Sequence, residues 1–142
     1  MAAITPGYDR IQYVQSFAAD AGAAINEPYA CVILGTGDND VIQSSAAQQP
    51  GVGFIRMETG QTYAVAGSVA QVAIATRLEV WYLGIVWAVA AAAFAKGIRL
   101  GTAAGGQVVT ASAASPYVAI SLAAAAAQHE IVPVLICIGT SV

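Results

Sequence analysis

The sequence predicts an all-β protein, a compact β-sandwich or barrel-like domain of short strands. Apolar residues recur with period two, and Gly or Pro turn signals separate the short apolar runs. No stretch shows the pattern of a long amphipathic helix. The 142 residues suffice for one domain with a hydrophobic core. We expect residues 1–10 to form an extended N-terminal arm and residues 11–142 a single β domain.

The first half of the chain alternates apolar runs with turn signals. Ile11, Tyr13 and Phe17 fall on one face of a strand predicted over 10–17. The next apolar run ends in the turn-rich "GTGDND" (35–40). Further strands of this half are predicted at 29–34, 51–57, 59–67 and 69–76.

The stretch "VWYLGIVWAVAAAAFAKG" (80–97) raises the question of a membrane span. Its uncharged part covers 80–95, whereas a membrane helix needs about 20 apolar residues. Between 80 and 89 most residues are β-branched or aromatic and favour strands. Gly84 marks a bulge or sharp bend. We therefore expect two strands and a connector here, with a buried helix and a membrane span as the alternatives.

The second of these strands alternates bulky and small side chains, which is typical of a packed barrel or a subunit interface. One face carries bulky residues and the other smaller ones: Ile85, Trp87 and Val89 against Val86, Ala88 and Ala90. "AAAAFAKG" is too short to nucleate a helix on its own. We interpret it as the strand end and the connector to the next strand.

The remaining strands are predicted at 98–100, 108–110, 117–122 and 130–139. Pro133 in the last one suggests an edge or bulge position. The two halves also show a loose echo, which Ala bias inflates. Its paired segments are 23–34 with 92–100, "VGFI" (52–55) with "YVAI" (117–120), and "VAQVAI" with "IVPVLI". An internally duplicated β unit is therefore one hypothesis, and chance similarity is the other.

Composition predicts an oligomer that binds neither nucleic acid nor membrane. Hydrophobic residues make up 58% and charged residues 9% of the chain, and such a surface is usually covered by another subunit or partner. The net charge is −3, and the five basic residues form no cluster of the kind that DNA binding needs. The N-terminus lacks the pattern of a secretory signal.

The sequence offers little material for catalysis, so we expect no enzyme, no cofactor and no metal. Asp38-Asn39-Asp40 lacks the distal Glu of an EF-hand loop and is interpreted as a solvated turn. His129-Glu130 is interpreted as a surface pair at a strand start, since one His makes a zinc site implausible. Cys31 and Cys137 are expected to be free buried thiols.

Several segments resemble the small capsid cement, or decoration, proteins of tailed bacteriophages. The segments are "YVQSFAADAGAAI", "GVGFI" and above all "GIRLGTAAGGQVVTASAASPYVAISLAAAAAQHEIVPVLI" (97–136). The chain departs from the family pattern at Leu122-Ala123 and in its longer segment 56–71. The resemblance implies a compact β protein that trimerises on the outer surface of the head. There it would bind the major capsid protein and stabilise the shell against DNA pressure, after synthesis in the host cytoplasm.

Two sets of candidate contact residues follow. The N-terminal arm can add a strand to an exposed sheet edge of the capsid. The capsid-contact candidates are Ile4, Tyr8, Arg10 and Tyr13. Aromatic residues are enriched at interfaces, although core packing is the plainer explanation for both tryptophans. The trimer-interface candidates are Trp81, Trp87 and Tyr82.

Two other functions remain open. The chain could be another phage structural β module, either a head-fibre base or a tail protein. It could also be a trimeric ligand-binding β domain with a pocket lined by Trp81, Trp87 and Tyr82. A convergent pocket with several polar groups would favour that last alternative.

Overall fold

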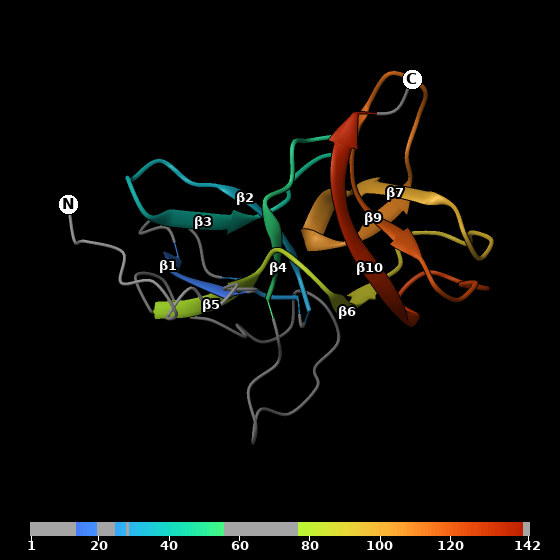
Figure 1. Cartoon of the computed structure of the whole chain (residues 1–142), viewed down its shortest axis with the longest axis horizontal. Coiled ribbons are helices and arrows are strands. Elements are labelled where there is room, and N and C mark those ends of the chain that lie inside the picture. The colour runs from blue at the N-terminus through green and yellow to red at the C-terminus, as the bar shows by residue number, and fades with distance from the viewer. Residues whose placement is uncertain (1–13, 20–24, 28, 56–76, 141–142) are drawn as a thin grey trace, which may run out of the picture.

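The structure is a computed structural model that describes residues 14–19, 25–27, 29–55 and 77–140 (Figure 1). The described residues form short strands in two sheets, so the all-β prediction is confirmed. The first sheet comprises β1 (Val14–Ala19), β2 (Cys31–Leu34), β3 (Asp40–Gln43), β4 (Gly53–Ile55) and β5 (Arg77–Trp81). The second comprises β6 (Ile85–Val89), β7 (Arg99–Thr102), β8 (Val108–Thr110), β9 (Pro116–Ser121) and β10 (Ile131–Thr140), with a 3₁₀ turn, η1 (Ala104–Gly106), before β8.

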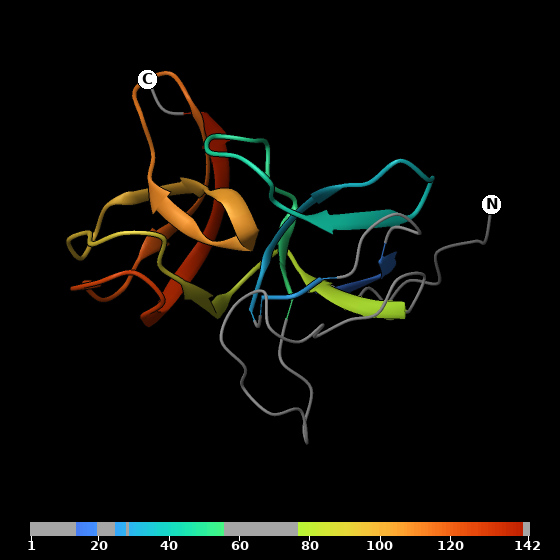
Figure 2. The same ribbon diagram turned by 180° about the vertical axis from the view of Figure 1, so that it is seen from behind.

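The first sheet closes into a small barrel in the order β1-β3-β2-β4-β5. β5 returns to pair antiparallel with β1, and β1 pairs in parallel with β3. The barrel lies on one side of the molecule and the second sheet on the other, and the view from behind shows the same division (Figures 1 and 2).

The second sheet repeats the path of the barrel. When β1 to β5 are matched in turn with β6 to β10, the closed barrel order becomes β6-β8-β7-β9-β10. Read in the opposite direction around the ring, this is β6-β10-β9-β7-β8, which is the order of the second sheet. Even the parallel contact recurs, because Ala19 is partner to Val41 in the barrel and Ala90 bridges Val108 in the second half. The hypothesis of a duplicated β unit is therefore confirmed at the level of strand order.

The sequence echo matched the right strands where the structure describes them. Segment 23–34 ends with β2 and segment 92–100 ends within β7, and these two strands are equivalent. β4 and β9, which contain parts of "VGFI" and "YVAI", are equivalent as well. The third match paired 69–74 with β10, but 69–74 lies outside the described residues. In the structure β5 holds the place equivalent to β10.

β4 and the start of β2 bury consecutive residues, so both of their faces are covered there, which explains their short apolar runs. Val32, Ile55 and Val80 belong to the cluster that fills the barrel. Their neighbours form a row across β2, β4 and β5, in which Cys31 pairs with Phe54 and Phe54 with Trp81. This row packs against the core of the second sheet. One layer of side chains therefore joins the two halves.

Polar contacts add to this junction. The buried hydroxyl of Ser44 donates to the carbonyl of Ala103 at 2.6 Å, and the amide of Gly106 donates to the carbonyl of Ser44 at 2.9 Å. The Thr102 hydroxyl, also buried, accepts from the amide of Gln49 at 2.7 Å. Buried polar groups that are satisfied in this way fix the relative position of the two halves.

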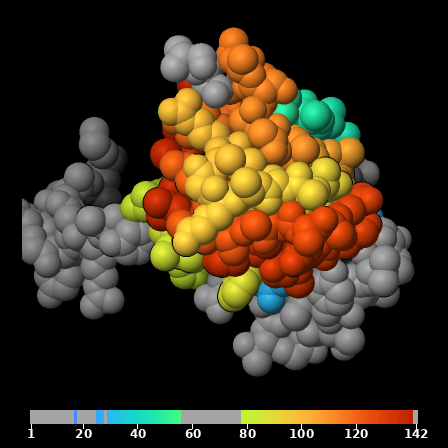
Figure 3. All heavy atoms as spheres, turned by 90° about the vertical axis from the view of Figure 1, so that its right-hand side faces the viewer, coloured from blue at the N-terminus to red at the C-terminus, as the bar shows by residue number. Residues whose placement is uncertain are grey.

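The stretch 80–97 forms two strands and a connector, as predicted. β5 and β6 belong to different sheets, and the chain crosses between them at Gly84, whose φ of 99° favours glycine. The Ala-rich connector meets the loop before β10 through a bridge between Phe94 and Ala125. Figure 3 shows these yellow and red segments side by side on one face. No helix among the described residues is long and apolar enough to cross a membrane.

Two strand predictions need correction. Pro133 lies in β10, which has neighbours on both sides and a bulge only further on, between Ile136 and Gly139. Its carbonyl accepts from the Leu122 amide, so its ring nitrogen faces the point just beyond the end of β9. Only the return bond to Leu122, at the end of this ladder, is lost there, which explains why proline is tolerated. The second correction is β3, for which no strand was predicted, because its residues "DVIQ" directly follow the turn.

Several predictions lie outside the described residues. These are the arm at 1–10 and the strands at 59–67 and 69–76.

Candidate interaction surface

The side of the second sheet that faces away from the core carries large apolar side chains. Val86 and Ala88 point into the core, whereas Ile85 is 67% and Trp87 51% exposed. The predicted separation of bulky from small residues in β6 holds from Ile85 to Ala88, whereas Val89, assigned to the bulky face, is fully buried. The small ones fit the tight core, and the two bulkiest remain outside.

The neighbouring strands extend this apolar surface. Ile85 pairs with Leu135 of β10, and Leu135 pairs with Ile120 of β9. Trp87 pairs with Pro133 in the same ladder. Leu135 is 40% exposed, and Ile120 and Pro133 are half-buried. We call this surface the outer face; it consists of Ile85, Trp87, Ile120, Pro133 and Leu135.

A charged residue borders the outer face at β7. Arg99 pairs with Ile120 and places its guanidinium 5.1 Å from the centre of the Tyr117 ring. The ring lies over Gly139, since a Cβ at that glycine would come within 2.5 Å of the Tyr117 hydroxyl oxygen. A cation held over an aromatic ring can add a specific contact at the border of an apolar surface.

The three aromatic candidates for a trimer interface occupy different environments. Trp87 lies on the outer face, whereas Trp81 is half-buried and packs against the core between the two halves. Tyr82 lies in the turn between the sheets and is 36% exposed, beside exposed Leu83. The structure therefore does not bring the two indoles to one surface. The capsid-contact candidates Ile4, Tyr8, Arg10 and Tyr13 lie outside the described residues.

Sequence analysis missed Ile85 and Leu135 as surface residues. The available signal was the alternation itself, because one face of a strand paired on both sides must point away from the core. Which face that is depends on the partner half, which the local pattern does not reveal.

The remaining polar candidates lie in turns, as predicted. Asp38 and Asn39 form the exposed tip between β2 and β3. His129 and Glu130 are exposed directly before β10. Among the described residues, no group of three or more His, Cys, Asp or Glu side chains could hold a metal ion.

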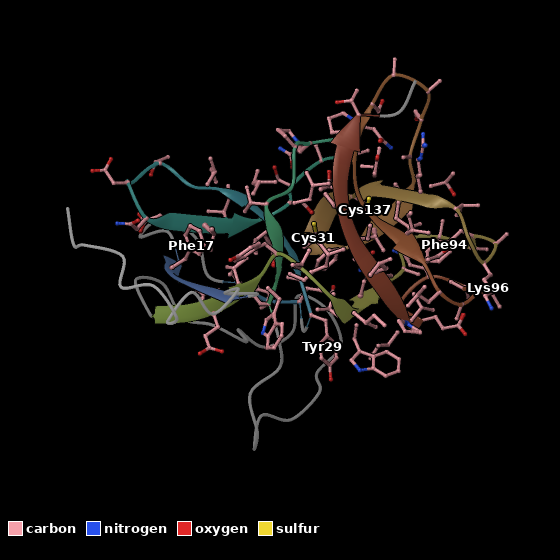
Figure 4. All side chains as sticks on the ribbon, viewed as in Figure 1. Phe17, Tyr29, Cys31, Phe94, Lys96 and Cys137 are labelled. Carbon is pink, nitrogen blue, oxygen red and sulfur yellow. The ribbon has the colours of Figure 1, made fainter. Side chains whose placement is uncertain are left out.

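Both cysteines are free, as expected, although only Cys31 is buried and Cys137 is half-exposed on β10. Burial raises the pKa of the Cys31 thiol to about 12, so this thiol stays protonated and unreactive. Figure 4 places Cys31 between the two halves and Cys137 on the long β10 strand.

A buried acid marks the boundary between the halves. Glu27 is 1% exposed, and burial raises the pKa of its carboxyl above the usual value of 4.5. A hydrogen bond from Gln107 and the nearby His129 act in the opposite direction and have smaller effects. No local sequence pattern predicts this contact, because the three residues are far apart along the chain.

Comparisons with known proteins give a likeness among solved structures. No protein-family model and no curated protein matches the chain. Among solved structures, the N base of the head fibre protein gp8.5 of bacteriophage phi29 is similar, with a TM-score of 0.53. The alignment covers 87% of this chain and 94% of that one at 17% sequence identity. At this identity the likeness establishes a shared fold.

Proposed function

We propose that this chain is a structural protein of a tailed-bacteriophage head. In this proposal it forms a homotrimer on the outer surface of the capsid, binds the major capsid protein and stabilises the shell. It acts by contact and not by catalysis. The observation that carries the proposal is the outer face, a regular sheet surface on which Ile85 and Trp87 are more than half exposed.

Physical arguments favour a protein partner for this face. Exposed apolar side chains that adjoin across several strands mark interaction sites more often than scattered ones do. Trp is also among the residues that dominate interface energies. The outer face as defined contains no charged side chain, and the nearest charge that its ladder pairs bring in is Arg99. Its contacts should therefore change little with salt, because screening weakens charged contacts.

The fold supports a place on the phage head. The similar structure is the base of a head fibre, and the sequence resembles capsid cement proteins in its second half. Both point to a small β protein at the head surface. The fold likeness specifically favours the alternative of a head-fibre base, in which the domain would anchor a longer projection.

Binding to expanded, undecorated phage heads tests the proposal. We expect the wild-type protein to sediment with the heads at low and at high salt. In this proposal the outer face joins the three copies of the trimer. A double variant, Ile85→Lys and Trp87→Lys, should therefore bind the heads far less, because a single protomer lacks the multivalent attachment of a trimer. Leu34→Lys is the matched control, because Leu34 is 63% exposed on the barrel half, away from the outer face. Absence of wild-type binding, or equal loss with Leu34→Lys, would contradict the proposal.

Electron microscopy of the decorated heads separates the two structural roles. A cement protein should occupy the three-fold or quasi-three-fold positions over the whole shell. A fibre base should occupy only the positions from which projections extend.

A further inference from the structure

A polar cluster joins the barrel to the second sheet through three side chains. Glu27 precedes β2, Gln107 precedes β8 and His129 precedes β10. The Gln107 Nε2 lies 3.1 Å from the Glu27 Oε2 and 3.0 Å from the His129 Nδ1. Glu27 and Gln107 are buried, with 1% and 5% exposure, whereas His129 lies at the surface. One amide group therefore serves two titratable side chains.

The hydrogen atoms of that amide fix the protonation of both neighbours. The NH₂ group has two hydrogens and no acceptor capacity. One hydrogen goes to the Glu27 carboxylate and the other to the His129 Nδ1. Nδ1 must then be the acceptor, so the neutral imidazole carries its proton on Nε2.

The opposite protonation state needs the opposite amide orientation. A proton on Nδ1 would point at the NH₂ group of Gln107 and break that bond. Turning the amide by about half a turn presents its oxygen, which has two lone pairs. That oxygen can accept from Nδ1–H, and it can accept from Glu27 only if the Glu27 carboxyl is protonated. A proton on His129 alone therefore leaves a mismatched contact at a buried amide, which is costly. A proton on Glu27 removes the obstacle to the turn, because a protonated carboxyl can either accept or donate.

We propose that Gln107 couples the protonation of Glu27 and His129, so that the cluster takes up two protons together as the amide turns. Both protons come from solvent, and no covalent bond changes other than the new N–H and O–H bonds. The contact between the two halves then has one form at high pH and another at low pH.

Electrostatic attraction opposes this coupling, because a charged imidazole favours an ionised carboxylate. His129 is exposed, however, so water screens its charge, whereas the mismatch falls on buried Gln107. Among the described residues, His129 is the charged group that acts on the Glu27 carboxyl. The carboxylate of the adjacent Glu130 accepts from the amides of Ala126 and Ala127. Burial also disfavours the ionised form of Glu27 and so raises the pKa of its carboxyl.

A nuclear magnetic resonance titration tests the proposal, and it is unambiguous because the chain has a single histidine. At high pH the imidazole ¹⁵N shifts should show the Nε2–H form. The His129 titration should be steeper than a one-proton curve, and the side-chain NH₂ signals of Gln107 should move with the same midpoint. Glu27→Gln should reduce the steepness to that of one proton, while the control Glu130→Gln should leave it unchanged.

The wild-type curve alone can overturn the proposal. A slope at or below that of one proton would show that electrostatic attraction prevails over the amide bonds. A proton on Nδ1 at high pH would exclude the proposed arrangement directly. Loss of steepness in Glu130→Gln would assign the coupling to Glu130 and contradict the role proposed for Glu27.

Discussion

At the scale of single residues, Trp81 and Trp87 show that neighbouring indoles can serve different purposes. Trp81 follows the row Cys31–Phe54 into the core between the halves. Trp87 is 51% exposed on the outer face. Trp87 therefore adds little to the folding stability of the free protomer. An exposed indole within an apolar surface is better explained by contact with a partner than by packing within the protomer.

Substitutions at Phe54 and Trp87 should separate these purposes. Phe54→Ala should lower the free energy of unfolding by about 3–5 kcal/mol, because the ring is fully buried where the two halves meet. Trp87→Ala should cost the protomer about 1 kcal/mol or less, since half of the indole is exposed. Urea denaturation at dilutions that dissociate oligomers measures both. Equal losses would contradict the division into core and outer face.

Glu27 should give the protein an unusual pH dependence. Its raised pKa means that the folded state binds this proton more tightly than the unfolded state. The stabilising contribution is fully present below about pH 4.5, the usual value of the carboxyl, and is lost as the pH rises through the raised pKa. Stability of the wild type relative to Glu27→Gln should therefore fall with rising pH. Denaturant titrations of both proteins across this range measure the difference, and parallel curves would contradict the assignment.

At the scale of elements, the 3₁₀ turn η1 shows how the second half fits against the barrel. Gly105 and Gly106 both have positive φ, at 72° and 76°. A Cβ on Gly105 would meet nothing within 4 Å, but one on Gly106 would come within 2.8 Å of the Ala30 Cβ. Gly105 thus adopts this φ region in open space, whereas Gly106 adopts it against Ala30, directly before β2.

This pair of glycines is a matched test of the junction. Gly105→Ala should cost about 1–2 kcal/mol, the penalty for a side chain in the left-handed region. Gly106→Ala should cost about 1–3 kcal/mol more, because the methyl group also overpacks the contact with Ala30. Thermal unfolding of both variants measures the difference. Equal costs would mean that η1 does not pack tightly against the barrel.

Local patterns explain which elements the sequence could predict. The alternation in β6, the turn at 35–40 and the bend at Gly84 depend on neighbours along the chain, and all three were predicted correctly. β3 is too short for its period to stand out. The junction of Glu27, Gln107 and His129 depends on how two halves meet, which no local pattern encodes. The candidate surface was therefore only partly predicted, through Trp87.

At the scale of the whole molecule, the repeat explains how a sequence of small residues makes a stable unit. Each half is a five-stranded unit with the same order, and the larger core cluster belongs mainly to the second half, while a smaller one fills the barrel. The row Cys31–Phe54–Trp81 combines them. The buried polar bonds of Ser44 and Thr102 then fix the halves in one arrangement. The second sheet can thus present the outer face as a firm surface.

If the trimer stabilises the shell, heads that lack the protein should release DNA at a lower temperature than decorated heads. Many modest contacts acting together would account for a large effect. Adding the purified protein should restore heat resistance at both low and high salt, because the outer face is apolar. Dye accessibility of the packaged DNA during heating measures this. Equal release temperatures with and without the protein would contradict a stabilising role.

The central claim is that the outer face joins copies of this chain, and sedimentation equilibrium without detergent tests it most directly. The wild type and the Leu34→Lys control should both sediment with three times the protomer mass of 14.3 kDa. The double variant Ile85→Lys and Trp87→Lys should sediment as a folded protomer. A wild type that stays monomeric at all concentrations, or a double variant that remains a trimer, would contradict the claim.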